Sequence, residues 1–320
     1  MEYELTVYSC LPEEEALLRS QAAKKRVELR LTREPLTLQN AHWARGTVSI
    51  SHRDSVDARA LKALSREGIC ALCTRSVGTD HIDLEAAKAL GIPVFNTPYS
   101  PEGVADYTLF LLLAALRGAP GIFRRTREGN FSLPGERAKE MHEMCIGVVG
   151  AGRIGRAVIR RLEGFGCKVR IADPGADAGE HPVSLETLLE TCDGLTLHLP
   201  LTPGTRHLLG EKEFQMMRPG TILVNTARGG LVDTSALLRA LDSGRCGFAA
   251  LDVVEEEKGV FGHAVRREAL CAPLAALAGH PRVLLSPHIA YYTLPGLRDT
   301  VERAIAIARQ GEGRLEKWIV

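Results

Sequence analysis

The chain of 320 residues is long enough for two domains with sizeable cores, at the ~100–200 residues that one domain usually takes. Its 40 lysines and arginines and 39 aspartates and glutamates leave a net charge of +1 and are scattered along the chain. This balance argues against nucleic acid or an anionic membrane as the main partner. The longest strongly apolar run, Leu109–Leu116, is far shorter than the ~20 residues that cross a bilayer. Because the N-terminus shows no secretory signal, we expect an intracellular, cytoplasmic protein.

Short apolar runs alternate with longer amphipathic stretches, which is the pattern of βαβ units and a parallel sheet. In the first part of the chain this pattern predicts strands and helices in alternation, at residues 5–8, from 13 onward, 47–50, 56–65, 68–73, 84–90 and 92–95. A helix that is apolar over most of its circumference is predicted between Pro101 and Arg117, and such a helix is buried between layers, domains or subunits. The alternation resumes at Cys145 and runs to Pro287, and a last helix is predicted over residues 297–310.

The eight cysteines are interpreted as reduced, small apolar residues, because the chain is long and shows no secretory signal. Cys70 and Cys73 form a C-x-x-C pair, but no second pair or nearby pair of histidines completes a zinc site. Their segment also has the apolar character of a strand. The sequence therefore predicts no metal site.

The most informative motif follows the buried-strand pattern Cys145–Val149 and reads Gly150-Ala151-Gly152-Arg153-Ile154-Gly155 before a helical stretch. The first glycine of such a motif allows a tight turn, and the second lets the backbone approach a diphosphate. The third lets the helix pack close to the strand, so that the diphosphate lies at the helix N-terminus. The motif in this context predicts a dinucleotide-binding site.

The acid that ends the next strand pattern indicates which dinucleotide is bound. Residues 167–172 read as this strand and Asp173 ends it, about 20 residues beyond the glycines, where the group that binds the adenine ribose hydroxyls is expected. A carboxylate repels a 2′-phosphate, and the following residues, Pro174 to Ala176, supply no arginine to hold one. NAD is therefore favoured over NADP.

Polar groups end four further strand patterns. These groups are His198, the run Asn225 to Arg228, Asp252 with the acidic run Glu255 to Glu257, and His288. Ligands of open α/β sheets bind at the carboxyl ends of the strands, so these groups could converge on one small anionic substrate. Each group also has a simpler interpretation that stays open at this point. The acidic run could be a solvated turn, His288 could be a buried histidine with its hydrogen bonds satisfied, and Arg228 could hold a helix C-terminus or a surface acid. His198 is more simply structural or a wall of the cofactor site.

Taken together, these motifs resemble those of the D-isomer-specific 2-hydroxyacid dehydrogenases over nearly the whole chain. Within that family the chain looks most like the D-lactate dehydrogenases of the vancomycin-resistance type. The residues behind this narrower resemblance are Arg75–Gly78, Ala105–Thr108, Gly164–Val169, Tyr291–Thr293 and Leu297–Glu302. Asp173 is a departure, because the resistance-type enzymes lack this acid, and their cofactor preference is therefore not carried over.

The resemblance implies an α/β fold of two doubly wound parallel-sheet domains. A Rossmann NAD-binding domain, residues 100–293, would be inserted into a flavodoxin-like substrate domain formed by residues 1–99 and 294–320, with the active site in the cleft. It also implies a homodimer built on the cofactor domains.

The resemblance further implies a reaction, hydride transfer from NADH to the keto carbon of pyruvate or a similar 2-oxo acid. His288 would be the general acid, Glu257 would hydrogen-bond its imidazole and favour the charged form, and Arg228 would bind the substrate carboxylate and carbonyl oxygen. The other substrate positions implied are Val77, Gly78, Tyr99 and Tyr291. The cofactor positions implied are Gly150, Gly152, Arg153, Ile154, Gly155, Asp173, Leu199, Pro200, Thr205, Thr226, Ala227 and Asp252.

Two alternatives remain. One is a dehydrogenase for a different acid, such as 2-hydroxyisocaproate, glycerate or phosphoglycerate. The other, from a different class, is a dinucleotide-regulated, protein-binding protein like the C-terminal-binding corepressors, which keep the same Arg, Glu and His. This second alternative is disfavoured because no long tail follows the last predicted helix and because the chain matches the lactate branch more closely.

Overall fold

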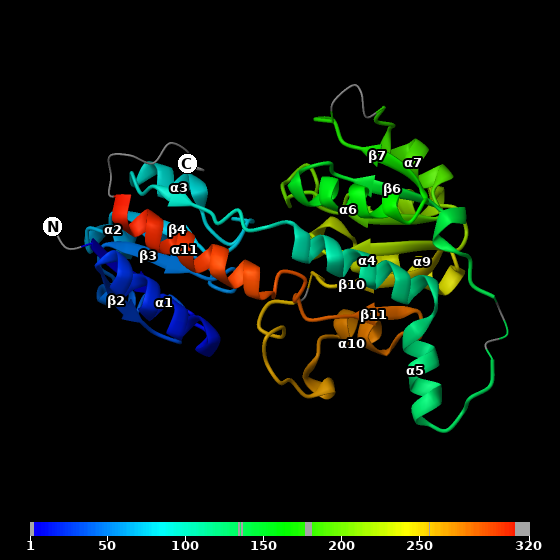
Figure 1. The fold of residues 1–320 in the computed structure, drawn as a ribbon, viewed down its shortest axis with the longest axis horizontal. Coiled ribbons are helices and arrows are strands. Elements are labelled where there is room, and N and C mark those ends of the chain that lie inside the picture. Colours follow the sequence, from blue (N-terminus) through cyan, green and yellow to red (C-terminus); the bar gives the residue numbers. More distant parts are fainter. Residues whose placement is uncertain (1–2, 134, 136, 177–180, 256, 311–320) are drawn as a thin grey trace. The chain divides into compact units, whose positions relative to one another are not determined.

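The computed structural model describes residues 3–133, 135, 137–176, 181–255 and 257–310. The chain divides into two compact units, one formed by Met1–Ser100 with Tyr292–Val320 and the other by Pro101–Tyr291 (Figure 1). The second unit is thus an insertion in the first. We describe each unit by itself.

The first unit is built on a five-stranded parallel sheet with the strand order β2-β1-β3-β4-β5. This is the flavodoxin-like order 2-1-3-4-5. Its strands are β1 (Tyr3–Val7), β2 (Val27–Leu31), β3 (Thr47–Ile50), β4 (Ala71–Thr74) and β5 (Val94–Phe95). All residues of β3 and β4 are buried, as expected of a sheet that is covered on both faces.

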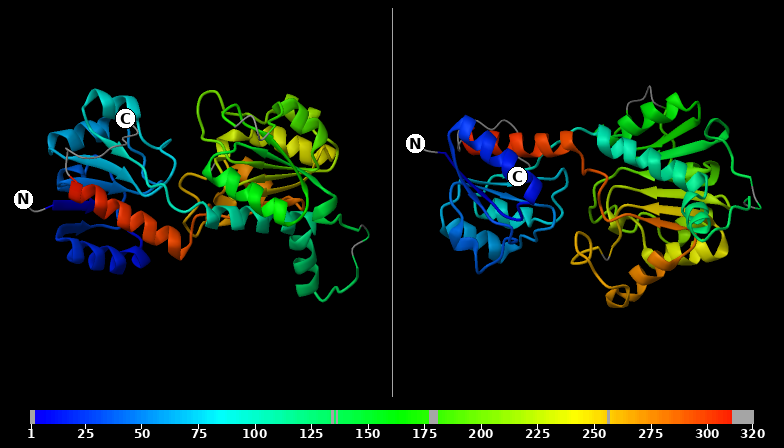
Figure 2. Two further views of the ribbon diagram at one scale, coloured as in Figure 1. Left: turned by 45° about the horizontal axis from the view of Figure 1, so that its top comes forward. Right: turned by 60° about the horizontal axis from the view of Figure 1, so that its bottom comes forward.

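Helices cover both faces of this sheet. They are α1 (Pro12–Lys25), α2 (Ala58–Arg66), α3 (Leu84–Ala89) and α11 (Leu294–Gln310), with a short 3-10 helix at Ala41–Trp43. Alternate residues of β4 face opposite sides, so that Leu72 packs with α2 and α3 while Cys73 packs with α1 and α11. Figures 1 and 2 show α11, in red, beside α1, in blue, so the end of the chain returns to the first sheet.

The second unit is built on a six-stranded parallel sheet with the order β11-β10-β9-β8-β6-β7. Its strands are β6 (Cys145–Val149), β7 (Lys168–Ala172), β8 (Gly194–Leu197), β9 (Thr221–Asn225), β10 (Cys246–Leu251) and β11 (Val283–Leu285). The chain goes from β6 to β7 on one side and then crosses to β8 on the other, so the strand order reverses at β6. Such a switch point is where open α/β sheets bind ligands.

Two groups of helices pack on this second sheet. Buried side chains of α4 (Glu102–Leu116) and α6 (Arg153–Gly164) cover one face. The other face is covered by α7 (Leu185–Thr191), α8 (Glu211–Met216), α9 (Thr234–Ser243) and α10 (Ala272–Gly279). The other helices within the described residues of this unit are α5 (Ala119–Arg127) and short 3-10 helices at Met141–Glu143, Gly229–Leu231 and Arg267–Ala269.

The predicted architecture of two parallel-sheet α/β domains is confirmed. The apolar helix expected between Pro101 and Arg117 is α4, whose Leu111 and Leu112 are fully buried while Phe110 is 56% exposed. Sequence patterns did not predict β2 or α5. Within the described residues, no single helix is long and apolar enough to cross a membrane, and only α4 and α5 taken together, across a bend of 67°, reach the required length and composition.

Candidate active site

The glycine loop joins β6 to α6 at the switch point of the second sheet. Gly150 has a φ of +94°, which favours glycine, and its N–H donates to the carbonyl of Ala172 at 2.9 Å. A Cβ on Gly150 would lie 2.7 Å from the carbonyl oxygen of His198, and a Cβ on Gly155 would collide with the carbonyl oxygen of Gly150. The first and third glycines are therefore required by close packing of the backbone.

Gly152 differs from the other two glycines of the loop. It precedes the first residue of α6, and apart from its chain neighbours no heavy atom of the described residues lies within 4 Å of the position of its Cβ. This open space lies beside the N-terminal N–H groups of a helix of 12 residues, which favour an anion. The loop therefore fits the diphosphate of a dinucleotide.

Asp173 lies at the end of β7 and is hydrogen-bonded to the same loop. Its Oδ2 accepts the N–H of Ala151 at 2.6 Å and its Oδ1 accepts the N–H of Gly175 at 2.7 Å. The carboxylate is half-buried and adjoins the glycine loop. Arg153 is exposed and Ile154 half-buried in the first turn of α6.

The end of β8 forms a wall against the glycine loop. His198 as a whole is only half-buried, but its Nε2 is shielded from solvent and has no hydrogen-bond partner among the described residues. Desolvation lowers the pKa of His198 to about 3, so the ring is neutral at ordinary pH. Leu199 lies over Gly150, and the hydroxyl of Thr205 donates to the carbonyl of Pro200 at 2.7 Å, which closes the turn that follows.

The residues after β9 form a rigid turn that carries Arg228. The side chain of Asn225 accepts the N–H of Ala227 at 3.0 Å and donates to the carbonyl of Arg228 at 2.9 Å. Arg228 is half-buried, and its Nη1 donates to the carbonyl of Ala227 at 2.7 Å. The buried hydroxyl of Thr226 lies 2.9 Å from that of Thr108 in α4. The side chain of Asn225 therefore fixes the backbone before and after the Cα of Arg228, and Thr108 holds the side chain of Thr226.

Asp252, at the end of β10, is fully buried. Its carboxylate accepts three hydrogen bonds from the segment after β11, namely from the hydroxyl of Ser286 at 2.6 Å, the N–H of Ile289 at 3.0 Å and the N–H of Ala290 at 2.8 Å. Its backbone carbonyl accepts the N–H of His288 at 2.8 Å. Asp252 therefore holds the loop that carries His288.

His288 is paired with Glu257. Its Nδ1 lies 2.8 Å from Oε1 of Glu257, and the two side chains are 16% and 26% exposed, so water still reaches the pair. The backbone of His288 has a φ of +54°, an uncommon value for a residue with a side chain, and such strain clusters at functional sites. The ring of Tyr291 packs edge-on against the imidazole of His288, with 5.9 Å between the two ring centroids.

The acidic run around Glu257 is not simply solvated. Glu255 accepts a hydrogen bond from the backbone N–H of Thr234 at 3.0 Å and one from its hydroxyl at 2.8 Å, and Nε2 of His207 lies 2.6 Å from its carboxylate. Burial alone would raise the pKa of Glu255, but these hydrogen bonds lower the pKa overall. Glu256 lies outside the described residues. Glu255 thereby ties the segment of Glu257 to the segment that follows Arg228.

The other substrate candidates lie in the first unit. Val77 and Gly78 are half-buried in the loop that follows β4. Tyr99 is half-buried too, and its backbone N–H donates to the carbonyl of Thr97 at 2.9 Å.

Three residues that hold the site together were given no individual role by the sequence analysis, although two of them lie in the polar runs that it named. They are Asn225, Glu255 and Ser286. Asn225 had a signal in the sequence, since an asparagine that ends a buried strand readily bonds to the backbone two residues on. Partners distant in the chain, such as those of Glu255 and Ser286, leave no local pattern.

The described residues contain no group of three or more His, Cys, Asp or Glu side chains placed to hold a metal ion. All eight cysteines are thiols rather than disulfides.

A glycine loop at the switch point of a parallel sheet, with an acid at the end of the next strand, defines a dinucleotide-binding domain. Residues 109–290 match the family model described as "D-isomer specific 2-hydroxyacid dehydrogenase, NAD binding domain". The chain is also 40% identical over 304 residues, covering 94% of each sequence, to a "D-specific alpha-keto acid dehydrogenase" of Enterococcus faecalis.

Two solved structures extend this likeness to the whole fold. D-lactate dehydrogenase from Aquifex aeolicus, complexed with NAD and lactic acid, has a TM-score of 0.84 and 31% identity, over 95% of this chain and 94% of that one. D-2-hydroxyisocaproate dehydrogenase has a TM-score of 0.86 and 30% identity, over 99% of each chain. The chain belongs to the D-isomer-specific 2-hydroxyacid dehydrogenase family. Members of this family include NAD-dependent oxidoreductases that act on CH–OH groups. The family predicted from the motifs is thus confirmed.

The open space at Gly152 leads to a first prediction. Gly152→Ala adds a methyl group that meets no protein atom, and the φ of −68° at this position suits alanine as well as glycine. The Tm of the variant is therefore expected to equal that of the wild type. The methyl group occupies the approach to the helix N-terminus, so NADH binding is expected to weaken roughly tenfold or more. Fluorescence titration with NADH and a thermal melt measure the two effects. Gly164→Ala, also in open space but at the other end of α6, is the control, and equal affinities in both variants would contradict the placement of the diphosphate.

Proposed function

We propose that the chain is an NAD-dependent D-2-hydroxyacid dehydrogenase that reduces pyruvate, or a similar small 2-oxo acid, to the D-2-hydroxy acid. The observation that carries the proposal is the 2.8 Å pair of His288 and Glu257, which sits with Arg228 at the carboxyl ends of the strands that also carry the glycine loop. The names of the relatives, which include a D-lactate dehydrogenase of Curvularia clavata, support this substrate class.

Proton transfer is assigned to His288. When bound, NADH supplies the hydride for the keto carbon. Glu257 engages Nδ1 of His288 and fixes the orientation of the ring. Nε2 of the imidazolium then donates the proton to the oxygen that becomes the hydroxyl of the product. His198, which is neutral and shielded from solvent, takes no part in this transfer.

Recognition of the acid is assigned to Arg228. A guanidinium offers a planar fork of donors that matches a carboxylate, and its charge also favours the negative oxygen that develops at the carbonyl. The turn fixed by Asn225 limits the movement of Arg228 and so reduces the entropy lost on binding. We also propose that the backbone N–H groups of Val77 and Gly78 bind the substrate carboxylate and that Tyr99 and Tyr291 contact the substrate.

An assay of NADH oxidation over a panel of 2-oxo acids tests this proposal. Pyruvate, 2-oxoisocaproate, phenylpyruvate and hydroxypyruvate are compared, and the wild type is expected to reduce at least one to the D-isomer, with the order of kcat/KM identifying the substrate. Arg228→Lys keeps the charge but loses the fork, so kcat/KM is expected to fall roughly 10²-fold. Arg239→Lys, on the exposed face of α9, is the control. Absence of NADH oxidation with every acid would contradict the proposed function.

For the cofactor, we propose a preference for NAD over NADP that is set by Asp173. The carboxylate accepts hydrogen bonds from ribose hydroxyls and repels a 2′-phosphate. Asp173→Ser is expected to raise the ratio of kcat/KM with NADPH to that with NADH, and parallel assays with the two cofactors measure it. An unchanged ratio would remove Asp173 from cofactor selection.

We further propose a homodimer formed by the second unit. Large apolar side chains are exposed there on α4, α5 and the segment after α5, including Phe123 at 65%, Phe131 at 78% and Leu133 at 90%. Large apolar side chains that stay exposed on successive segments of a chain are expected where a second protein covers them. Sedimentation is expected to give the mass of a dimer for the wild type and that of a monomer for Phe123→Glu, with Leu38→Glu, a 45% exposed leucine of the first unit, as control. A monomeric wild type contradicts the proposal.

A further inference from the structure

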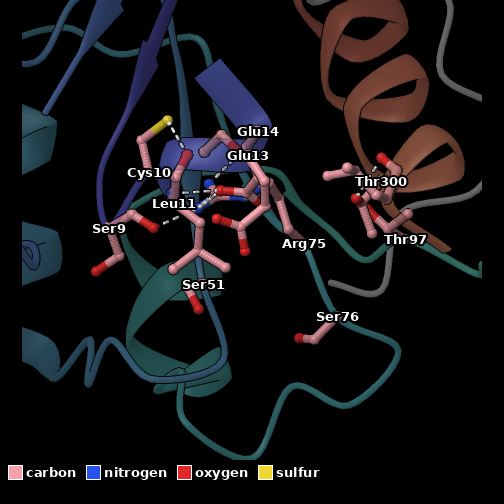
Figure 3. A network of polar contacts seen from close by, with 12 residues as sticks. Ser9, Cys10, Leu11, Glu13, Glu14, Ser51, Arg75, Ser76, Thr97 and Thr300 are labelled. Atoms are coloured by element: carbon pink, nitrogen blue, oxygen red, sulfur yellow. Dashed lines mark hydrogen bonds and ion pairs between the residues drawn. The ribbon is translucent and has the colours of Figure 1, made fainter. Parts of the chain in front are cut away.

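Arg75 is a buried arginine directly after β4, and the proposed reaction gives it no role. Its side chain is 3% exposed and forms an ion pair with Glu14, itself 9% exposed, with Nε and Oε1 at 3.2 Å. The remaining guanidinium atoms are used as well. Nη1 donates to the hydroxyl of Ser49 at 3.1 Å, and Nη2 donates to the carbonyls of Tyr8 and Ser9, both at 3.0 Å. Figure 3 shows Arg75 beside Glu14 and Ser9.

These contacts link three strand ends to one helix. Tyr8 and Ser9 follow β1, Ser49 lies near the end of β3, and Glu14 lies in the first turn of α1, where its Oε2 also accepts the N–H of Leu11 at 2.8 Å. Arg75 itself follows β4. The guanidinium therefore fixes the carboxyl edge of the first sheet, which is the edge where open α/β sheets bind ligands.

Ser9 shows how strongly this edge is constrained. Its φ is +47°, a strained value for serine, and it is held there by three contacts. The carbonyl accepts from Arg75, the N–H donates to the carbonyl of Glu34 at 3.0 Å, and the hydroxyl donates to the buried Asp54 at 2.8 Å. Asp54 in turn accepts the N–H of Ser51 at 2.6 Å, so two buried charges fix the ends of β1 and β3.

Arg75 also begins the loop that carries Val77 and Gly78. The three carbonyls after Arg75 are all engaged within the first unit. Ser76 O accepts the N–H of Thr97 at 2.9 Å, Val77 O accepts Nδ2 of Asn96 at 2.7 Å, and Gly78 O accepts the hydroxyl of Ser76 at 2.7 Å. The N–H groups of Val77 and Gly78, by contrast, have no acceptor within the described part of the chain.

A buried ion pair is a poor device for stability alone, because the cost of removing two charges from water offsets their attraction. Apolar side chains would fill the same space at less cost, whereas they could not bind two carbonyls and a hydroxyl at once. We propose that Arg75, paired with Glu14, is a positioning residue that holds the loop of Val77 and Gly78 so that their N–H groups recognise the substrate carboxylate. This inference rests on the function proposed above.

The test separates positioning from stability with a double variant. Arg75→Met alone leaves the carboxylate of Glu14 buried without its partner and is expected to lower Tm strongly. Arg75→Met with Glu14→Gln removes both charges, and the glutamine keeps an oxygen for the N–H of Leu11, so Tm is expected to recover toward the wild-type value. The donors to Tyr8, Ser9 and Ser49 stay lost, so the KM for the 2-oxo acid is expected to remain raised roughly tenfold or more. The affinity for NADH and, within a few fold, kcat are expected to be unchanged, because the cofactor loop lies in the other unit.

The matched control is another ion pair of the first unit, Arg45 with Glu67, whose charged atoms lie 3.2 Å apart and whose side chains are partly exposed. Arg45→Met with Glu67→Gln is expected to leave the KM unchanged. Arg75→Lys, which keeps the charge but loses the fork, gives a second measurement if the double variant fails to fold, and it too is expected to raise the KM while NADH binding stays unchanged.

The outcomes separate this inference from the function on which it rests. If the wild type is active and the KM for the 2-oxo acid is unchanged in the folded double variant or in Arg75→Lys, only the inference about Arg75 is overturned. A wild type that oxidises NADH with none of the acids overturns the proposed function and the inference together.

Discussion

The geometry of the candidate catalytic pair depends on the buried carboxylate of Asp252. It accepts three hydrogen bonds from residues 286–290, and its backbone carbonyl accepts the N–H of His288, so one residue at the end of β10 determines the path of the chain after β11. His288 adopts a left-handed backbone conformation that a histidine would not keep without such contacts. The 2.8 Å distance to Glu257 follows from that path.

The same arrangement recurs at other strand ends. Asn225 binds both sides of the turn that carries Arg228, and Glu255 ties the segment of Glu257 to Thr234. In the first unit Arg75 and Asp54 do the same for the ends of β1, β3 and β4. In each case a polar side chain that does no chemistry itself holds a loop at the carboxyl edge of a parallel sheet, which is how a rigid sheet positions functional groups on loops.

Much of this could be predicted from the sequence, because buried parallel strands are short apolar runs and the glycine loop has fixed spacing. β2, by contrast, was missed because charged residues interrupt Val27–Leu31, which lies at the sheet edge, and α5 because no buried residue marks a core face. The contacts of Asp252, Glu255 and Arg75 join residues far apart in the chain and follow no local pattern. The roles of Arg228, Glu257 and His288 in the reaction stay predictions that came from the resemblance.

Removal of the imidazole tests the central claim most directly, because the proton transfer is assigned to His288. His288→Ala is expected to lower kcat for the preferred 2-oxo acid by roughly 10²–10⁴-fold, since the proton donor is lost. The affinity for NADH is expected to stay at the wild-type value, because the glycine loop is untouched. His263→Ala, at an exposed position of the same unit, is the control and is expected to keep the wild-type kcat. A wild-type kcat in His288→Ala would contradict the account.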